Sequence, residues 1–138
     1  MILLFMAMSL PVSGPGLQTP LEREAIRFAQ AWEEEDARLL GEVMAREGIR
    51  LRMPGEQHVL IRPRQAQAAL EAFLDRYEGG ETEVTRVSMA GGDSGKGFAE
   101  IQWRTGSPGV VEPVIFTVFV AYALESERWV VTEIRVLF

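Results

Sequence analysis

The sequence has 138 residues, of which 47% are hydrophobic and 25% are charged, and its formal net charge is −6. This length and composition are typical of one globular domain with its own hydrophobic core. The negative charge argues against nucleic-acid binding, which needs a basic face. Because the chain contains no cysteine, disulfide bonds, thiolate metal sites and cysteine nucleophiles are excluded.

Residues 2–10 form an almost wholly apolar run, followed by a stretch rich in proline and glycine at residues 11–16. The run is too short for a stable membrane span, which takes about 20 residues. Its length, and the small residues after it, are typical of a signal peptide, although no basic residue precedes it. We expect residues 1–16 to be a signal peptide of an exported protein, or an apolar arm of a cytoplasmic one, and residues 19–138 to form a single domain.

The first helix is predicted to begin at Pro20, because Thr19 and Glu22 have the spacing of a capping box and proline suits the first helical turn. Its apolar residues recur on one face: Leu21, Ala25, Phe28 and Trp32. This spacing predicts an amphipathic helix that packs on the core.

Two more helices are predicted. Asp36 is placed to cap the second helix, which carries Leu39, Leu40, Val43 and Met44 and ends at Gly48. The third begins at Pro63, has Tyr77 as its last apolar residue, and is stopped by the glycine pair at 79–80.

The remaining segments predict strands. Residues 49–53 alternate between apolar and charged side chains, and residues 58–61 return after a turn. Four further strands are expected at residues 82–90, 97–105, 110–124 and 128–138, joined by short loops that make them antiparallel neighbours. Helices followed by a run of strands indicate an α+β domain.

Two local patterns resemble those of a known superfamily. The first is Phe28-x-x-x-Trp32-x-x-x-Asp36 followed by Leu39-Leu40, and the second is the final alternating run, residues 128–136, with a tryptophan near its start. Together with the element order, they resemble the nuclear transport factor 2-like superfamily, which includes SnoaL-like cyclases, ketosteroid isomerase and scytalone dehydratase. The resemblance implies a cone: three helices packed in the concave face of a strongly curved antiparallel sheet, with a pocket at the open end. It also implies a homodimer through the outer face of the sheet.

Several polar groups were weighed as catalytic residues. The glycine-rich segment at residues 91–96 lacks the spacing of a phosphate-binding loop and reads as a hairpin loop. His58 is the only histidine and follows a turn, which favours a solvent-exposed position. The first helix lacks the oxyanion tyrosine of ketosteroid isomerase, because the chain's tyrosines are Tyr77 and Tyr122, and capping suffices to explain Asp36.

The predicted strand at residues 110–124 is apolar on both faces, so both faces need a cover. The helices cover one face, and a second copy of the domain is the simplest cover for the other. We therefore expect Ile115 and Phe119 at a two-fold interface. Charged residues of the outer face would form its rim: Glu100, Arg104, Glu133 and Arg135.

The leading functional hypothesis is an exported domain that binds a small hydrophobic ligand or a protein partner, without catalytic residues, metal or cofactor. The predicted pocket residues are the large apolar side chains that several elements direct inward: Phe28, Trp32, Met53, Phe73, Trp103 and Phe116. One alternative is a small dehydratase or isomerase that acts on a hydrophobic substrate in the cone. Another is a pure dimerisation module with a filled cone.

Overall fold

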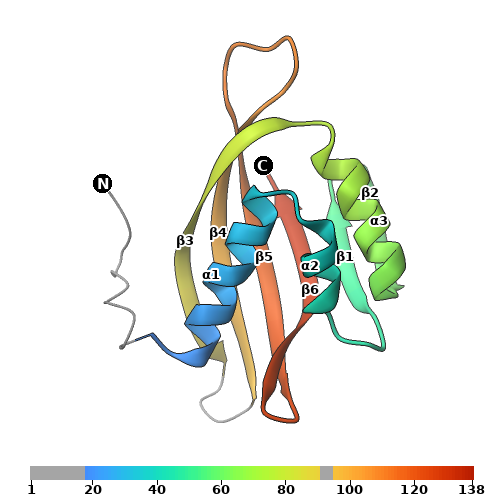
Figure 1. Cartoon of the computed structure of the whole chain (residues 1–138), viewed down its shortest axis with the longest axis vertical. Coiled ribbons are helices and arrows are strands. Elements are labelled where there is room, and N and C mark those ends of the chain that lie inside the picture. The colour runs from blue at the N-terminus through green and yellow to red at the C-terminus, as the bar shows by residue number, and fades with distance from the viewer. Residues whose placement is uncertain (1–17, 91–94) are drawn as a thin grey trace.

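The computed structural model describes residues 18–90 and 95–138, which form three helices on one side of a six-stranded sheet (Figure 1). The expected signal segment, residues 1–16, lies outside the described residues, as do residues 91–94 of the predicted hairpin loop. The helices are α1 (Pro20–Glu33), α2 (Ala37–Glu42) and α3 (Pro63–Leu74). The strands are β1 (Ile49–Met53), β2 (Glu56–Ile61), β3 (Glu78–Ala90), β4 (Lys96–Gly106), β5 (Val114–Glu125) and β6 (Arg128–Leu137).

The strand order of the sheet is β2-β1-β6-β5-β4-β3. Strands β3 to β6 form the predicted antiparallel meander, and Figure 1 shows β3 bending over the helices. The predicted α+β cone is therefore confirmed. One pair departs from the expected all-antiparallel sheet, because β1 runs parallel to β6, with Leu51 opposite Ile134. Alternation within a strand does not reveal which distant strand becomes its neighbour, so the sequence could not show this pair.

The capping box at the start of α1 is present as predicted. The backbone N–H of Glu22 donates to the Thr19 hydroxyl over 3.1 Å, and the Thr19 N–H donates to the Glu22 carboxylate over 2.8 Å. These two bonds fix the direction in which α1 crosses the sheet. All four predicted core residues of the helix are buried: Leu21, Ala25, Phe28 and Trp32.

Two predicted helices end earlier than expected. Helix α2 stops at Glu42, and Met44 instead forms a bridge with Val131 of β6. Helix α3 stops at Leu74, so Tyr77 lies beyond it and the glycine pair belongs to β3 rather than ending the helix. Both glycines have positive φ, at 63° and 133°, and the register of β3 against β4 shifts beside them. The pair bends the strand.

Strand β5 begins at Val114 rather than at residue 110. The N–H of Val110 donates to Ser107 O over 3.0 Å and closes a turn, and Pro113 cannot donate to a strand ladder. Val111, which we had expected on the outer face of this strand, lies before it and is 99% exposed.

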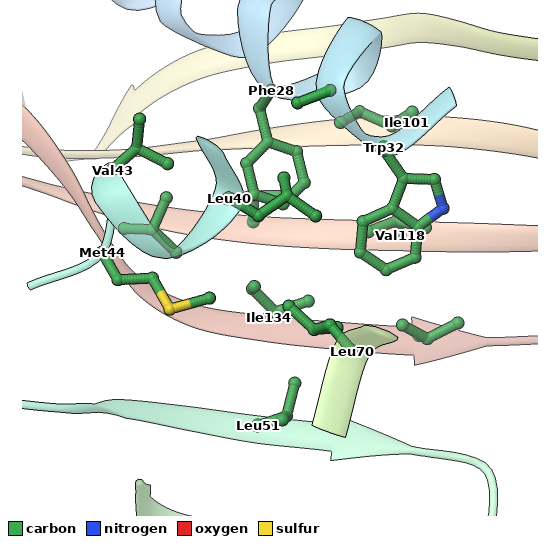
Figure 2. Packing of buried hydrophobic residues seen from close by; sticks show 14 of the residues in the cluster. Phe28, Trp32, Leu40, Val43, Met44, Leu51, Leu70, Ile101, Val118 and Ile134 are labelled. Carbon is green, nitrogen blue, oxygen red and sulfur yellow. The ribbon is translucent and has the colours of Figure 1, made fainter. Parts of the chain in front are cut away.

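The core lies between the helices and the concave face of the sheet. Figure 2 shows Phe28 and Trp32 of α1 above Val118 of β5, with Leu40 of α2 beside them. Buried and more exposed residues alternate along β4 and β5, so each strand presents one face to the helices. Within residues 18–90 and 95–138, none of the helices has the length and hydropathy needed to cross a membrane.

Candidate functional site

An aromatic cluster fills the end of the cone at which β4 ends and β5 begins. The ring centroid of Trp103 in β4 lies 5.0 Å from Phe116, 5.4 Å from Tyr77, 5.6 Å from Trp32 and 6.0 Å from Phe73. These side chains come from α1, α3, the segment after α3, and the sheet. Rings from every layer of the domain therefore meet around one tryptophan.

The predicted pocket residues are all buried in one continuous core: Phe28, Trp32, Met53, Phe73, Trp103 and Phe116. Phe28 extends the aromatic cluster along α1, since its ring stacks on Trp32 at 5.9 Å. Met53 belongs to the same hydrophobic core at the end of β1. Their part in ligand binding stays a prediction.

Two aromatic residues of the cluster were missing from the predicted pocket. Tyr77 had been assigned to the third helix, yet its half-buried ring contacts Phe73, Trp103 and Phe116. The ring of Phe138 lies 4.9 Å from that of Phe116. The inward alternation of β6 continues through Ile134 and Val136 to Phe138, and this signal was sufficient to place it.

The indole nitrogen of Trp32 is the unusual polar atom of the cluster. The residue is 1% exposed, and its Nε1 has no hydrogen-bond partner among the described residues. Figure 2 shows this nitrogen on the side of the ring that faces away from Phe28. The rings around it offer at most π-faces, which are weak acceptors. An unpaired buried donor costs about 1–3 kcal/mol, so an acceptor oxygen supplied here would recover free energy.

The end of α1 that carries Trp32 is fixed to β3. The Glu33 carboxylate accepts from the backbone N–H of Thr82 over 2.8 Å and from its hydroxyl over 2.9 Å. On the same strand, Gly80 allows a close approach, since a Cβ there would lie 2.9 Å from Trp103 Nε1. Thr82 and Gly80 thus hold the two tryptophans in place from one strand.

A second candidate surface lies on the outer face of the sheet. It is a hollow of about 350 Å³ lined by Arg86, Phe98, Phe119, Val120, Ala121, Glu133 and Arg135. We call it the outer groove. The guanidinium of Arg86 lies 5.2 Å from the Phe98 ring centroid, and that of Arg135 lies 5.3 Å from Phe119. Ala121 stands opposite Phe98 in the sheet register, so a small side chain sits between two large ones.

The predicted rim charges lie around this groove and are paired within the chain. Glu133 lies 3.6 Å from Arg135, and Glu100 lies 3.6 Å from Arg86, a residue that the sequence analysis did not select. Arg86 was missed because the register shift in β3 interrupts the alternation that would have assigned it to the outer face.

The arrangement of elements matches several solved structures. A ketosteroid isomerase-like protein from Erwinia carotovora has a TM-score of 0.71 and 14% identity, over 85% of this chain and 92% of that one. A protein from Catenulispora acidiphila with a ketosteroid isomerase-like fold, solved with trimethylamine, has a TM-score of 0.64 and 15% identity, over 83% of each chain. A DUF4783 family protein from Bacteroides uniformis has a TM-score of 0.65 and 17% identity, over 78% of this chain and 90% of that one. The chain has the nuclear transport factor 2-like fold. No protein-family model matches its sequence, and neither does any curated protein.

Within this nuclear transport factor 2-like domain, the polar residues considered from the sequence have other partners. Asp36 caps α2, as predicted, by accepting from the Leu39 N–H over 3.1 Å. His58 lies on the edge strand β2, where its Nε2 is 2.6 Å from the Glu56 carboxylate. The predicted full solvent exposure of His58 is wrong only in degree, since its side chain is half-buried against this partner.

Tyr122 lies inside the domain on β5, facing α1. Its hydroxyl donates to the Glu24 carbonyl over 3.5 Å. Burial raises the pKa of Tyr122 well above its usual range, and the negative charge of Glu24 raises it further. The phenol is therefore neutral at physiological pH, and its position against the first turns of α1 makes it part of the core.

Proposed function

We propose that this domain binds a small, mostly apolar ligand that carries a hydrogen-bond acceptor, within the aromatic end of the cone. The observation that carries the proposal is the unpartnered Nε1 of Trp32, a donor enclosed by apolar side chains. Ligand sites are typically apolar, with a few polar groups that fix the orientation of the ligand. Trp32 supplies such a group, and the surrounding rings supply the apolar wall.

The fold supports the same proposal. One of the compared proteins was solved with trimethylamine, so a small molecule has been captured by a protein of this architecture. The rings of the cluster are held by elements from both layers, so they form a rigid wall against which a flat apolar molecule can pack. The ligand we propose has a ketone, ester or ether oxygen that accepts from Trp32.

The proposal is tested with two probes of similar size, acetophenone and ethylbenzene, of which only acetophenone has a carbonyl oxygen. Affinities are measured by calorimetry for the wild type and for Trp32→Phe, which removes the N–H and keeps an aromatic ring. We expect the ratio of acetophenone to ethylbenzene affinity to be about five- to tenfold higher in the wild type, as one hydrogen bond predicts.

The ratio cancels two effects that would confuse a single measurement. The lower hydrophobicity of acetophenone is the same for both proteins, and the extra space left by Trp32→Phe is the same for both probes. An equal ratio in the two proteins would contradict the role of the indole. Leu124→Ala, an exposed change on β5, serves as a control that should keep the wild-type ratio.

We also propose that the domain forms a homodimer through the outer groove. Phe119 and Ala121 follow one another on the outer face of β5, so a two-fold axis near them would place the phenyl ring of each copy over the alanine of the other. Ile115 is exposed on the same face, and the charges of Arg86 and Arg135 lie beside the hollow. A symmetric contact would then bury this apolar patch in both copies.

Sedimentation equilibrium at micromolar concentration tests the dimer. We expect the protein without residues 1–16 to sediment as a dimer, and Ala121→Leu, which fills the hollow, to sediment as a folded monomer. Leu124→Ala is the matched control and should remain dimeric. A soluble, folded monomer of the unsubstituted protein would overturn the interface. A dimer that binds neither probe would instead favour the dimerisation-module hypothesis.

Export is a third proposal, carried by the sequence alone. The apolar run at residues 2–10 and the small residues after it suit a signal peptide. We expect protein secreted by the native host to begin near residue 16, as measured by intact-mass spectrometry. A secreted or cytoplasmic product that retains Met1 would rule out cleavage.

A further inference from the structure

The ring of Phe138 covers the aromatic cluster from outside. Its centroid lies 4.9 Å from that of Phe116, and the two rings are tilted by 31°. Phe116 is completely buried, whereas Phe138 is 81% exposed. A side chain with so little buried surface is held weakly, yet it stands over one of the most buried rings in the domain.

Beneath Phe138 lies a ready-made surface for another ring. Phe116 forms its floor, and Tyr77 and Trp103 meet Phe116 at 5.2 Å and 5.0 Å. Tyr77 approaches edge-on, at 81° to Phe116, whereas Trp103 stacks at 23°. Stacked and edge-on partners around one ring are the arrangements that aromatic groups prefer. If Phe138 turned away, Phe116 would lose its outer cover and gain an open face.

We propose that Phe138 is a displaceable plug, and that a neutral, planar aromatic ligand enters the cone by stacking on Phe116 in its place. This inference rests on the proposed ligand-binding function and specifies the ligand class and the route of entry. The phenyl ring of Phe138 and the ring of the ligand compete for the same face of Phe116. The plug therefore lowers the affinity for every one-ring ligand by the same factor.

The test uses Phe138→Ala with the same two probes, acetophenone and ethylbenzene. Because the plug competes with the ring of the probe, both affinities are expected to rise at least threefold, while their ratio stays at the wild-type value. Phe138→Leu keeps an apolar side chain without a planar ring and should give an intermediate gain. Leu124→Ala, at another exposed apolar site, should leave both affinities unchanged.

The common gain reports on Phe138 and the ratio reports on Trp32, so the two proposals can fail separately. Unchanged or weaker binding of both probes by Phe138→Ala would overturn the plug, since Phe138 would then be part of the binding surface or irrelevant to it. Failure of the variant to bind either probe would overturn it as well. Because Phe138 is exposed, Phe138→Ala is expected to fold, and its thermal unfolding curve checks this in the same samples.

Discussion

Trp32 and Trp103 meet edge to face, with ring centroids 5.6 Å apart and ring planes at 83°. One ring comes from the end of α1 and the other from the middle of β4, so their contact joins the helical layer to the sheet. Edge-to-face pairs contribute about 0.5–1.5 kcal/mol beyond the area that they bury. The same packing encloses Trp32 Nε1 without an oxygen acceptor, which couples the stability of this region to the binding that we propose.

The first prediction separates the ring of Trp32 from its N–H. Trp32→Ala should lower the free energy of unfolding by about 3–5 kcal/mol, because it leaves a large cavity between the layers. Trp32→Phe keeps a ring and removes the unpaired donor, so we expect a loss below about 2 kcal/mol. Urea unfolding measures both. Equal losses for the two variants would mean that the ring does not carry the packing at this position.

The second prediction concerns the glycine pair in β3. Gly79 and Gly80 both have positive φ, but nothing lies within 4 Å of a Cβ at Gly79, whereas one at Gly80 would meet Trp103 Nε1 at 2.9 Å and Arg104 O at 3.0 Å. Gly79→Ala should cost only backbone strain, about 1 kcal/mol, and Gly80→Ala about 2–3 kcal/mol in total. Thermal unfolding of both variants gives the comparison. Identical costs would show that Trp103 shifts freely.

A third prediction follows from the raised pKa of Tyr122, which burial causes first and Glu24 second. In the unfolded chain a tyrosine loses its proton near pH 10, but the folded state keeps it. The stabilising effect is therefore fully present below about pH 10 and decreases above it, by up to about 1.4 kcal/mol per pH unit. Tyr122→Phe cannot lose a proton, so it should be less sensitive to alkali than the wild type.

Urea unfolding at pH 8 and at pH 11 measures this difference. At pH 8 we expect Tyr122→Phe to be about 1 kcal/mol less stable, through loss of the hydrogen bond to Glu24 O. Between pH 8 and pH 11 the wild type should lose more stability than the variant. The same loss in both proteins would show that Tyr122 ionises as readily in the folded state as in the unfolded chain.

Much of the fold could be predicted from periodicity and turn chemistry. The capping box at Thr19 and the alternation around Trp103 identified the start of α1 and the inward face of β4, because each depends on neighbours within a few residues. The parallel pairing of β1 with β6 could not be predicted in this way. It depends on which distant strands meet, as when Leu51 comes to lie opposite Ile134.

The candidate site was predicted in its interior and missed at its rim. Trp103 and Phe116 lie on plainly alternating strands, so their inward direction was readable. Tyr77 was misassigned because helical spacing continued past Leu74, where the structure turns into β3. The unpaired state of Trp32 Nε1 could not be predicted, because it depends on what every surrounding element fails to offer.

The most direct test of the central claim is the ¹H–¹⁵N spectrum of the indole N–H groups. The chain has three tryptophans, and the signal that disappears in Trp32→Phe identifies Trp32. On titration with acetophenone, we predict that the Trp32 indole proton moves downfield, as a new hydrogen bond to the carbonyl requires, and that ethylbenzene produces no downfield shift. A Trp32 signal that stays in place while acetophenone binds, or that moves equally with both probes, would contradict the proposal that this indole donates to the ligand.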